Sequence, residues 1–394
     1  MKKKLLIPMI IFTTLLIIAL VLYQDSKITV DNTLFSLKEN LTVNVYDNVK
    51  ISSFIKNIKG RIISDEEIDT KKVGSKKVSF IYINNKNRKR KGTFNINIVD
   101  TEKPLVWVSN KYNIKVGSKD NLMDNIMCAD NYDKNPLCEI RGEYNLNEKG
   151  IYPLTYFAKD SSGNTSVIDF YLNVYEPTQN NNSDSNVTYF NDVIKEYKTS
   201  NNLIGIDVSK WQKNIDFEKV KASGASFVMI RMGYQNGVNG KYIEDSYFQN
   251  NIENAIKNNI KVGVYFYSYA DSKNEAKRQA KWVLNKVKKY KIDLPIAFDW
   301  ECYTSFNSMD LSLFGLGEIA NSFLDTIEKS NYNAMLYASK NYLINVWKYN
   351  KYDVWLANYS KKTDYNGKYI MRQLCEDGII DGIDEKVDID ILYF

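Results

Sequence analysis

Beyond residue 202 the chain alternates between short apolar runs and longer stretches whose apolar residues recur at helical spacing. The apolar runs predict eight strands, at Leu203–Val208, Phe227–Met232, Val262–Tyr269, Leu294–Trp300, Ala334–Ala338, Val354–Asn358, Tyr369–Leu374 and Val387–Tyr393. The stretches between them predict five helices, at Asp216–Ala222, Asp245–Asn258, Lys273–Tyr290, Leu311–Lys329 and Lys340–Lys348. Strands that alternate with helices pair in parallel, and about eight of them close most simply into a barrel. We therefore predict an α/β fold for residues 202–394, a modified TIM-like β/α barrel whose last part lacks helices.

One of these apolar runs, Leu294–Phe298, is followed by two acidic residues. Asp299 and Glu301 are two positions apart, so in an extended chain they point to the same side, about 6.6 Å apart along the strand. Trp300 points to the other side. Enzymes with a β/α barrel place their chemistry at the carboxyl ends of the strands. A solvated strand end is the competing interpretation, because a motif this short is weak evidence.

Two further acids lie at predicted strand ends, Asp207 in IGIDVSKWQ and Asp388 in KVDIDILYF. Strand ends converge on a barrel, and crowded carboxyl groups raise each other's pKa, which leaves one of them able to act as an acid. Glycoside cleavage needs this arrangement. The sequence contains no histidine, which excludes Ser-His-Asp and Cys-His catalysis and histidine-ligated zinc hydrolases. Hydrolysis would therefore depend on carboxyl groups, and we expect neither a metal nor a cofactor.

The net charge of +6 is modest, and no basic stripe with interleaved aromatic residues is present in the sequence. This pattern disfavours nucleic acid as a partner. A mildly basic exported protein would be attracted to anionic polymers of the cell wall. Simple solubility explains the charge equally well.

The N-terminus predicts a membrane anchor. Lysines occupy positions 2–4, and Leu5–Tyr23 is nearly all apolar and uncharged. Such a segment can cross a bilayer as one transmembrane helix, with the lysines in the cytoplasm and the rest of the chain outside. A cleaved signal peptide is the alternative, but no clear small-x-small cleavage site precedes Gln24. We assign residues 1–27 to this anchor and expect a single-pass membrane protein whose remaining residues are extracellular, in the cell wall.

Between the anchor and the barrel, residues 28–101 and 102–176 each show alternating strands separated by polar turns. This spacing predicts two antiparallel all-β sandwiches. The second, with Gly150-x-Tyr152 and Asp160-x-x-Gly163-Asn164, resembles bacterial immunoglobulin-like surface repeats. We expect both to be spacers, with weak wall binding as the alternative. The polar residues 177–201 predict a flexible linker.

The chain contains four cysteines. Cys128 and Cys138 lie close together in a loop-like segment, and in an oxidising exterior they are predicted to form a disulfide. Cys302 and Cys375 are far apart in the sequence, and we expect them to be inert, partly buried thiols. None of the four has zinc-like spacing.

Residues 203 to 394 resemble glycoside hydrolase family 25, the lysozymes that cleave bacterial peptidoglycan. The resemblance is carried by a series of motifs, in order and at sensible spacing, which are Gly205-Ile206-Asp207-Val208-Ser209 with Trp211-Gln212, Arg231-x-Gly233, Gly263-x-Tyr265-x-Tyr267, Asp299-Trp300-Glu301, Leu336-Tyr337, Trp355-x-Ala357 and Val387-Asp388-Ile389-Asp390. One position departs from the family, because Arg372 stands before Gln373 where members often have tryptophan. We expect this change to alter a sugar subsite more than the chemistry.

The resemblance implies N-acetylmuramidase activity, which cleaves the β-1,4 bond between N-acetylmuramic acid and N-acetylglucosamine in peptidoglycan. It implies that Glu301 is the general acid and that Asp299 stabilises the transition state. Asp207 and Asp388 would hold this pair and the sugar by hydrogen bonds. The choice of Asp388 over Asp390 follows the family's Val-Asp pattern, since strand alternation puts both on one face. Retention through the substrate's acetamido group and inversion by water both stay open.

Several other residues are candidates for binding sugar. Aromatic rings that could stack on it are those of Tyr265, Tyr267, Trp300, Tyr337 and Trp355, and we expect about half of them to be core residues. Gln373 completes the set. Two other functions compete with the muramidase: a non-catalytic wall-binding or adhesion protein with an inactive barrel, and a glycosidase for another amino-sugar polymer.

Overall fold

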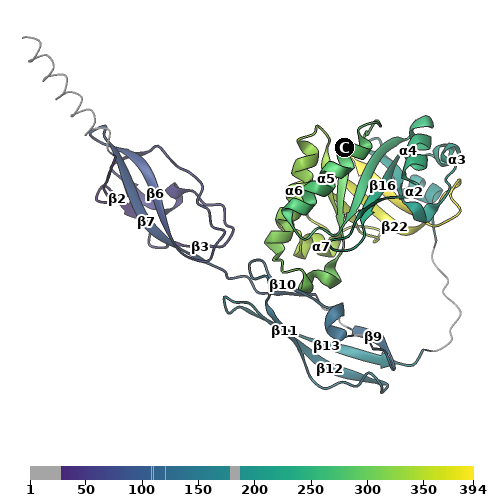
Figure 1. The fold of residues 1–394 in the computed structure, drawn as a ribbon, viewed down its shortest axis with the longest axis horizontal. Coiled ribbons are helices and arrows are strands. Elements are labelled where there is room, and N and C mark those ends of the chain that lie inside the picture. Colours follow the sequence, from purple (N-terminus) through teal and green to yellow (C-terminus); the bar gives the residue numbers. More distant parts are fainter. Residues whose placement is uncertain (1–27, 108, 110, 120, 178–186) are drawn as a thin grey trace, which may run out of the picture. The chain divides into compact units, whose positions relative to one another are not determined.

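A computed structural model describes residues 28–107, 109, 111–119, 121–177 and 187–394. The chain divides into two compact units, one ending at Glu102 and one comprising Lys103–Phe394 (Figure 1). The predicted anchor, Leu5–Tyr23, lies outside the described residues. Within the described ranges, no helix is long and apolar enough to cross a membrane.

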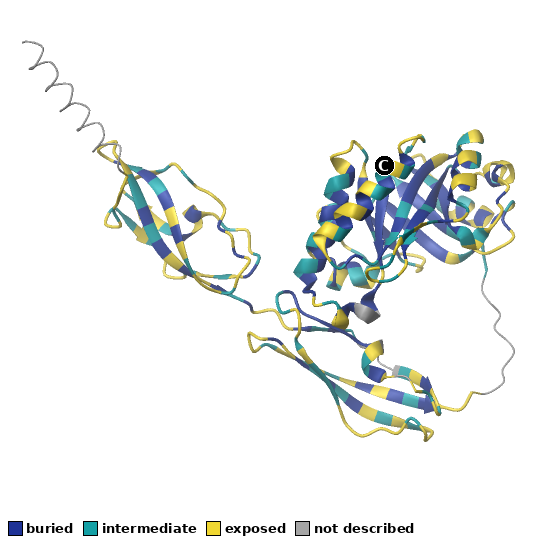
Figure 2. Ribbon diagram, viewed as in Figure 1, coloured by how far each residue is buried: buried dark blue, intermediate teal, exposed yellow. Residues whose placement is uncertain are grey.

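The first unit is all-β. A five-stranded sheet contains β1 (Thr29–Val30), β3 (Thr42–Asn44), β5 (Gly60–Ile62), β6 (Gly74–Asn84) and β7 (Lys89–Val99). A two-stranded sheet pairs β2 (Phe35–Leu37) with β4 (Ile55–Ile58), which follows the 3-10 helix η1 (Ile51–Phe54). Along the antiparallel hairpin of β6 and β7, buried residues such as Phe80, Tyr82 and Phe94 alternate with more exposed ones (Figure 2). One face of this sheet therefore carries an aromatic core.

The second unit begins with another all-β segment. Four strands form one sheet in the order β11 (Leu137–Arg141), β12 (Gly150–Lys159), β13 (Thr165–Tyr175) and β9 (Lys111–Lys115). A small second sheet pairs β10 (Met127–Ala129) with β8 (Leu105–Trp107), and η2 (Leu122–Asn125) precedes β10. The disulfide predicted between Cys128 and Cys138 is confirmed, and Cys302 and Cys375 are free and buried. The all-β character agrees with the sequence, whereas the immunoglobulin-like assignment and the domain boundaries stay predictions.

The barrel predicted for the C-terminal half is confirmed. Its eight strands are β15 (Asn202–Val208), β16 (Phe227–Gln235), β18 (Lys261–Ser268), β19 (Ile296–Trp300), β20 (Ala334–Ser339), β21 (Asp353–Ala357), β22 (Met371–Ile379) and β23 (Val387–Tyr393). Neighbours from β15 to β22 are parallel, and β23 closes the barrel because it pairs antiparallel with both β15 and β22. Two short strands, β14 (Thr188–Tyr189) and β17 (Tyr242–Glu244), extend the sheet.

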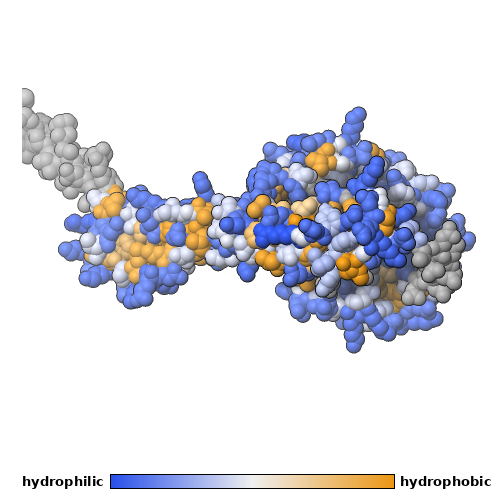
Figure 3. Space-filling view, turned by 90° about the horizontal axis from the view of Figure 1, so that it is seen from below, coloured by the Kyte–Doolittle hydropathy of each residue, from blue (hydrophilic) through white to orange (hydrophobic). Residues whose placement is uncertain are grey.

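The five predicted helices are present on the outside of the barrel. They are α3 (Phe217–Ala222), α4 (Phe248–Lys257), α5 (Lys273–Val287), α6 (Leu313–Glu328) and α7 (Lys340–Asn345), and α2 (Phe190–Tyr197) precedes the first barrel strand. Ser272 and Ser312 cap α5 and α6, since each hydroxyl accepts a hydrogen bond from the first helical turn. Two 3-10 helices, η3 (Lys210–Gln212) and η4 (Tyr303–Ser308), follow β15 and β19. The face of the barrel seen in Figure 3 is mostly hydrophilic.

Alternation along the strands separates two apolar layers. One faces the helices and includes Ile206 and Phe298, the latter packed against Phe323 of α6, whereas the barrel interior is filled by residues such as Met229 and Met335. Several strand boundaries differ from prediction. The strand β19 begins at Ile296, after Pro295, which has no N–H to donate to a neighbouring strand. The strand β22 continues to Ile379, because its end pairs with β23 as a hairpin.

Candidate active site

A cavity of about 180 Å³ opens at the carboxyl ends of the barrel strands. We call it the acidic pocket, and it is lined by Asp207, Arg231, Tyr265, Tyr267, Asp299, Glu301, Tyr337, Trp355, Gln373 and Asp388. Nine of the ten residues predicted as catalytic, binding or supporting therefore line one pocket, from seven of the eight strands or the residue that follows one, and Trp300 is the exception. A larger cavity of about 580 Å³ lies between α2 and the end of β22, and none of the nine lines it.

The acids Asp299 and Glu301 occupy different depths of the acidic pocket. Asp299 is only 5% exposed, and its Oδ1 has no hydrogen-bond partner among the described residues. Glu301 follows the last residue of β19 and keeps contact with solvent. Between them Trp300 is fully buried and donates from Nε1 to the Ala270 carbonyl at 3.1 Å. The prediction that Trp300 could stack on sugar is wrong, because alternation along β19 turns its ring into the core.

A hydrogen-bonded network supports the opposite wall. Asp207 and Asp388 are directly opposite each other on β15 and β23. Gln373 donates from Nε2 to Asp207 Oδ2 at 2.8 Å, which fixes the orientation of its amide. Its Oε1 accepts from the hydroxyls of Tyr337 and Tyr359, both at 2.9 Å. Gln373 therefore couples the carboxyl group of Asp207 to two tyrosines.

The structure distinguishes Asp388 from Asp390. Asp388 lines the acidic pocket, whereas Asp390 is fully buried and its Oδ1 accepts a hydrogen bond from Trp355 Nε1 at 2.8 Å. Asp390 lies opposite Gly205 and Gln373 in the sheet, one pleat further from the strand ends than Asp388. Asp388 is therefore the residue that can reach a substrate.

Burial and repulsion from neighbouring carboxylates raise the pKa of each of the four carboxyl groups that line the acidic pocket. The pKa of Asp299 is raised well above its usual value by burial and then by Glu301 and Asp207, while Arg231 opposes the shift. Burial and the charge of Glu376 raise the pKa of Glu301, although this side chain is open to solvent at the mouth. Burial and Asp207 raise the pKa of Asp388 to about 9. At Asp388 a protonated carboxyl group is therefore available at neutral pH.

Asp390 provides a test of this electrostatic strain. Burial and the neighbouring Asp388 raise its pKa well above 3.8 in the folded protein. The stability that comes from holding this proton is fully present below the unfolded pKa and is lost as the pH rises through the folded pKa. We therefore expect Asp390→Asn, which keeps the acceptor for Trp355, to increase the free energy of unfolding at pH 8 by on the order of 1–3 kcal/mol.

Urea denaturation at pH 5 and pH 8 measures this effect, and the gain should be larger at pH 8. The exposed Asp384, which lies in the turn before β23, supplies the control Asp384→Asn. A loss of stability for Asp390→Asn at pH 8, or an equal change at both pH values, would contradict the expectation.

Two residues at the site were not predicted. Arg231 lines the acidic pocket and forms an ion pair with the buried Asp245 at 2.7 Å, so its guanidinium is fixed in position. The motif Arg231-x-Gly233 could have indicated that this arginine belongs to the site. Tyr359 was missed because it lies in the loop after β21, where local periodicity gives no signal, and its hydrogen bond to Gln373 connects it to the site.

Arg372, the residue that departs from the family pattern, lies behind the acidic pocket. Arg372 is 4% exposed, and its guanidinium donates to the carbonyls of Asn358 and Ser360. These bonds hold the loop that carries Tyr359. Arg372 thus affects the pocket through the position of this tyrosine.

Comparisons with known proteins find similarity over the part of the chain that forms the barrel. Residues 206–383 match the family model described as glycosyl hydrolases family 25. The Escherichia coli (strain K12) protein YegX is 28% identical over 195 residues, which cover 48% of this chain and 68% of YegX. The autolytic lysozyme of Clostridium acetobutylicum is 24% identical over 189 residues, which cover 47% of this chain and 54% of that lysozyme.

A solved structure of a family 25 glycosyl hydrolase from Bacillus anthracis aligns with a TM-score of 0.44 and 21% identity, over 54% of this chain and 95% of that one. The family match includes Asp207, Asp299 and Glu301, whereas Asp388 lies five residues beyond its end. Residues 206–383, which contain most of the barrel, are therefore similar to the glycosyl hydrolases of family 25.

Proposed function

We propose that this protein hydrolyses bacterial peptidoglycan by cleaving the β-1,4 bond between N-acetylmuramic acid and N-acetylglucosamine. The observation that carries the proposal is the pair Asp299 and Glu301, two carboxyl groups of raised pKa at the end of β19 in an aromatic-lined pocket. A glycosidase needs one protonated carboxyl group at the leaving oxygen and one ionised group near the anomeric carbon.

In the proposed mechanism, Glu301 donates a proton to the leaving oxygen. Its place at the solvent-open mouth lets it regain the proton from water after each cycle. Asp299 stabilises the positive charge that develops on the sugar, and its free Oδ1 accepts a hydrogen bond from the substrate's acetamido N–H. Arg231 is the cation that acts on the pKa of Asp299, which favours the ionised form of this residue.

The other pocket residues bind and orient the sugar. Asp207 and Asp388 offer carboxyl groups to its hydroxyls, and Gln373 fixes Asp207. The rings of Tyr265, Tyr267 and Tyr337 are partly exposed in the pocket. Trp355 is 1% exposed and packs against Tyr265 and Tyr337, so it supports these rings from behind.

Digestion of purified peptidoglycan tests the activity. Products should carry new reducing ends of N-acetylmuramic acid, identified by mass spectrometry after borohydride reduction. If the new reducing ends are N-acetylglucosamine instead, the protein cleaves the other glycosidic bond of the polymer and not the proposed one. Intact peptidoglycan would favour the non-catalytic wall-binding alternative.

We also propose that the protein is anchored in the cell membrane by Leu5–Tyr23 and that its remaining residues are extracellular. The disulfide Cys128–Cys138 supports an oxidising location, and the first β unit would act as a spacer. We expect the full-length chain to remain with membranes after high-salt and carbonate washes. Deleting residues 5–23 should abolish this association. A mature N-terminus found downstream of Tyr23 would instead indicate a cleaved signal peptide.

A further inference from the structure

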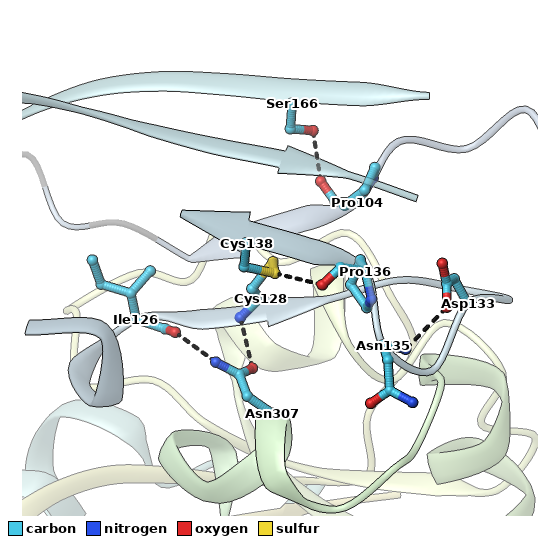
Figure 4. The surroundings of a disulfide bond; sticks show 9 residues. All are labelled: Pro104, Ile126, Cys128, Asp133, Asn135, Pro136, Cys138, Ser166 and Asn307. Atoms are coloured by element: carbon cyan, nitrogen blue, oxygen red, sulfur yellow. Dashed lines mark hydrogen bonds between the residues drawn. A yellow bond between two sulfur atoms is a disulfide. The ribbon is translucent and has the colours of Figure 1, made fainter. Parts of the chain in front are cut away.

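The all-β segment at the start of the second unit makes specific contacts with the barrel next to the catalytic strand. Asn307, in η4, accepts at Oδ1 from the Cys128 N–H at 3.0 Å and donates from Nδ2 to the Ile126 carbonyl at 3.2 Å (Figure 4). The amide thus pairs with the backbone of β10 and its preceding residue as another strand would. The disulfide Cys128–Cys138 constrains this segment from the other side.

The loop closed by the disulfide also completes the start of α6. The N–H groups of Leu313 and Phe314, which an isolated helix leaves without partners, donate to the carbonyls of Asp130 and Asn131 at 2.8 and 3.3 Å. Asp310, just before the helix, accepts from Asn135 Nδ2 at 2.7 Å. The segment from η4 to α6 is thus held at both ends by backbone groups of the β segment.

An aromatic stack connects the β segment to the catalytic strand. Trp107 of β8 stacks on Tyr342 with ring centroids 5.0 Å apart, and Tyr342 stacks on Tyr303 at 3.4 Å. Tyr303 packs edge-on against Trp300 at 5.3 Å, and its hydroxyl accepts from Trp347 Nε1 at 2.9 Å. Trp300 lies between Asp299 and Glu301 in the sequence. The stack therefore extends from the β segment to the residue that separates the two catalytic acids.

Glu301 lies between the barrel sheet and the segment that these contacts hold. Glu301 lies one residue beyond β19 and two residues before Tyr303, so the sheet fixes it on one side only. A general acid must be held to within about 0.5 Å of its working position. We propose that residues 103–175 are a positioning element of the active site, with Trp107 and Asn307 holding the segment after β19 and thereby Glu301. This inference rests on the proposed function, and it assigns to the second β segment a role other than that of a spacer.

Substitution of Trp107 tests the proposal in the full-length chain. Trp107→Ala should lower kcat on peptidoglycan by about 10- to 100-fold with little change in KM, since a displacement of about 1 Å costs a rate of this order. A looser segment admits water around Glu301, so its pKa should fall and the alkaline limb of the pH profile should move to lower pH. Trp107→Phe, which keeps a stacking ring, should restore most of both properties.

Tyr171→Ala is the matched control, because Tyr171 is a half-exposed aromatic residue of β13 in the same segment. It should leave kcat and the pH profile unchanged. Asn307→Ala, which removes two hydrogen bonds and no ring, should act in the same direction as Trp107→Ala. Wild-type kcat and pH profile in both Trp107→Ala and Asn307→Ala would overturn the proposal.

Hydrogen exchange gives a measurement that does not depend on activity. Amide exchange in the segment 301–308 should be faster in Trp107→Ala than in the wild type and in Tyr171→Ala. If the wild type does not cleave peptidoglycan but this exchange increases, the proposed function fails while the positioning contact stands. Unchanged exchange in an active enzyme would reject the positioning role alone.

Discussion

Glu301→Gln should lower kcat on peptidoglycan by about 10²–10⁴-fold and leave the fold intact. Glutamine has the size and hydrogen-bonding groups of the acid but no proton to donate to the leaving oxygen. The side chain is open to solvent, so the substitution leaves no buried polar group without a partner. Turnover is measured from new reducing ends, and circular dichroism and thermal unfolding report the fold.

The matched control is Glu318→Gln on α6, where the carboxylate forms a surface ion pair with Lys273. It should retain wild-type turnover, because an exposed pair of this kind contributes little to stability. If Glu301→Gln also cleaves peptidoglycan at nearly the wild-type rate, the general acid must be sought among Asp207, Asp388 and Asp390.

Asp299→Asn should have the second-largest effect, a loss of about 10²–10³-fold in kcat, because it removes the charge that stabilises the transition state. Asp299 is buried and 5% exposed, so the charge acts at low dielectric and is poorly replaced by water. The double variant with Glu301→Gln should be only slightly worse than the more impaired single variant, since groups that act together are not additive. Additive losses would contradict a shared step.

The pH profile distinguishes the two roles. The wild type should give a bell-shaped profile whose limbs belong to the pair. Repulsion from neighbouring carboxylates, Glu301 among them, raises the pKa of Asp299, so the two acids titrate together. The rate falls at low pH when Asp299 gains a proton and at high pH when Glu301 loses one. Since the pKa values of both groups are raised, the optimum should lie above the usual carboxyl range. Asp299→Asn should remove the acidic limb.

Burial favours a proton on Asp299 as well as on Glu301, and the assignment of roles depends on what each residue faces. Arg231 lowers the pKa of Asp299, whereas the charge of Glu376 raises that of Glu301. If Glu301→Gln removed the acidic limb and Asp299→Asn removed the alkaline limb, the two roles would be exchanged. Asp388→Asn should reduce turnover less than either, because its predicted contact is with the sugar and the network rather than the broken bond.

The sequence by itself determined the elements of the barrel. Apolar runs of strand length and the helical spacing between them depend only on local periodicity, so all eight strands and five helices could be predicted. The position of Asp299 and Glu301 on one side of a strand end also follows from the period of two. The family motifs then specified the acids and aromatic residues that line one pocket, although their individual roles stay predictions.

Only the tertiary structure decided which of two equivalent residues reaches the pocket. Asp388 and Asp390 share a face of β23, and no local pattern separates them. Asp390 lies one pleat deeper, where pairing with β15 and β22 surrounds it and Trp355 donates to it. The antiparallel closure by β23 is likewise invisible in the sequence, since strand direction depends on where the chain returns.

The contacts between the β segment and the barrel could not be predicted from the sequence either, because they join residues that are far apart in the chain. Asn307 and Cys128 are 179 residues apart, and Trp107 and Tyr342 come from separate folding elements. Local periodicity predicts which residues are buried, but it cannot predict which surface buries them. The packing of two elements that are distant in the chain is set by the shape and hydrogen-bonding groups of both surfaces together, and these exist only once each has folded.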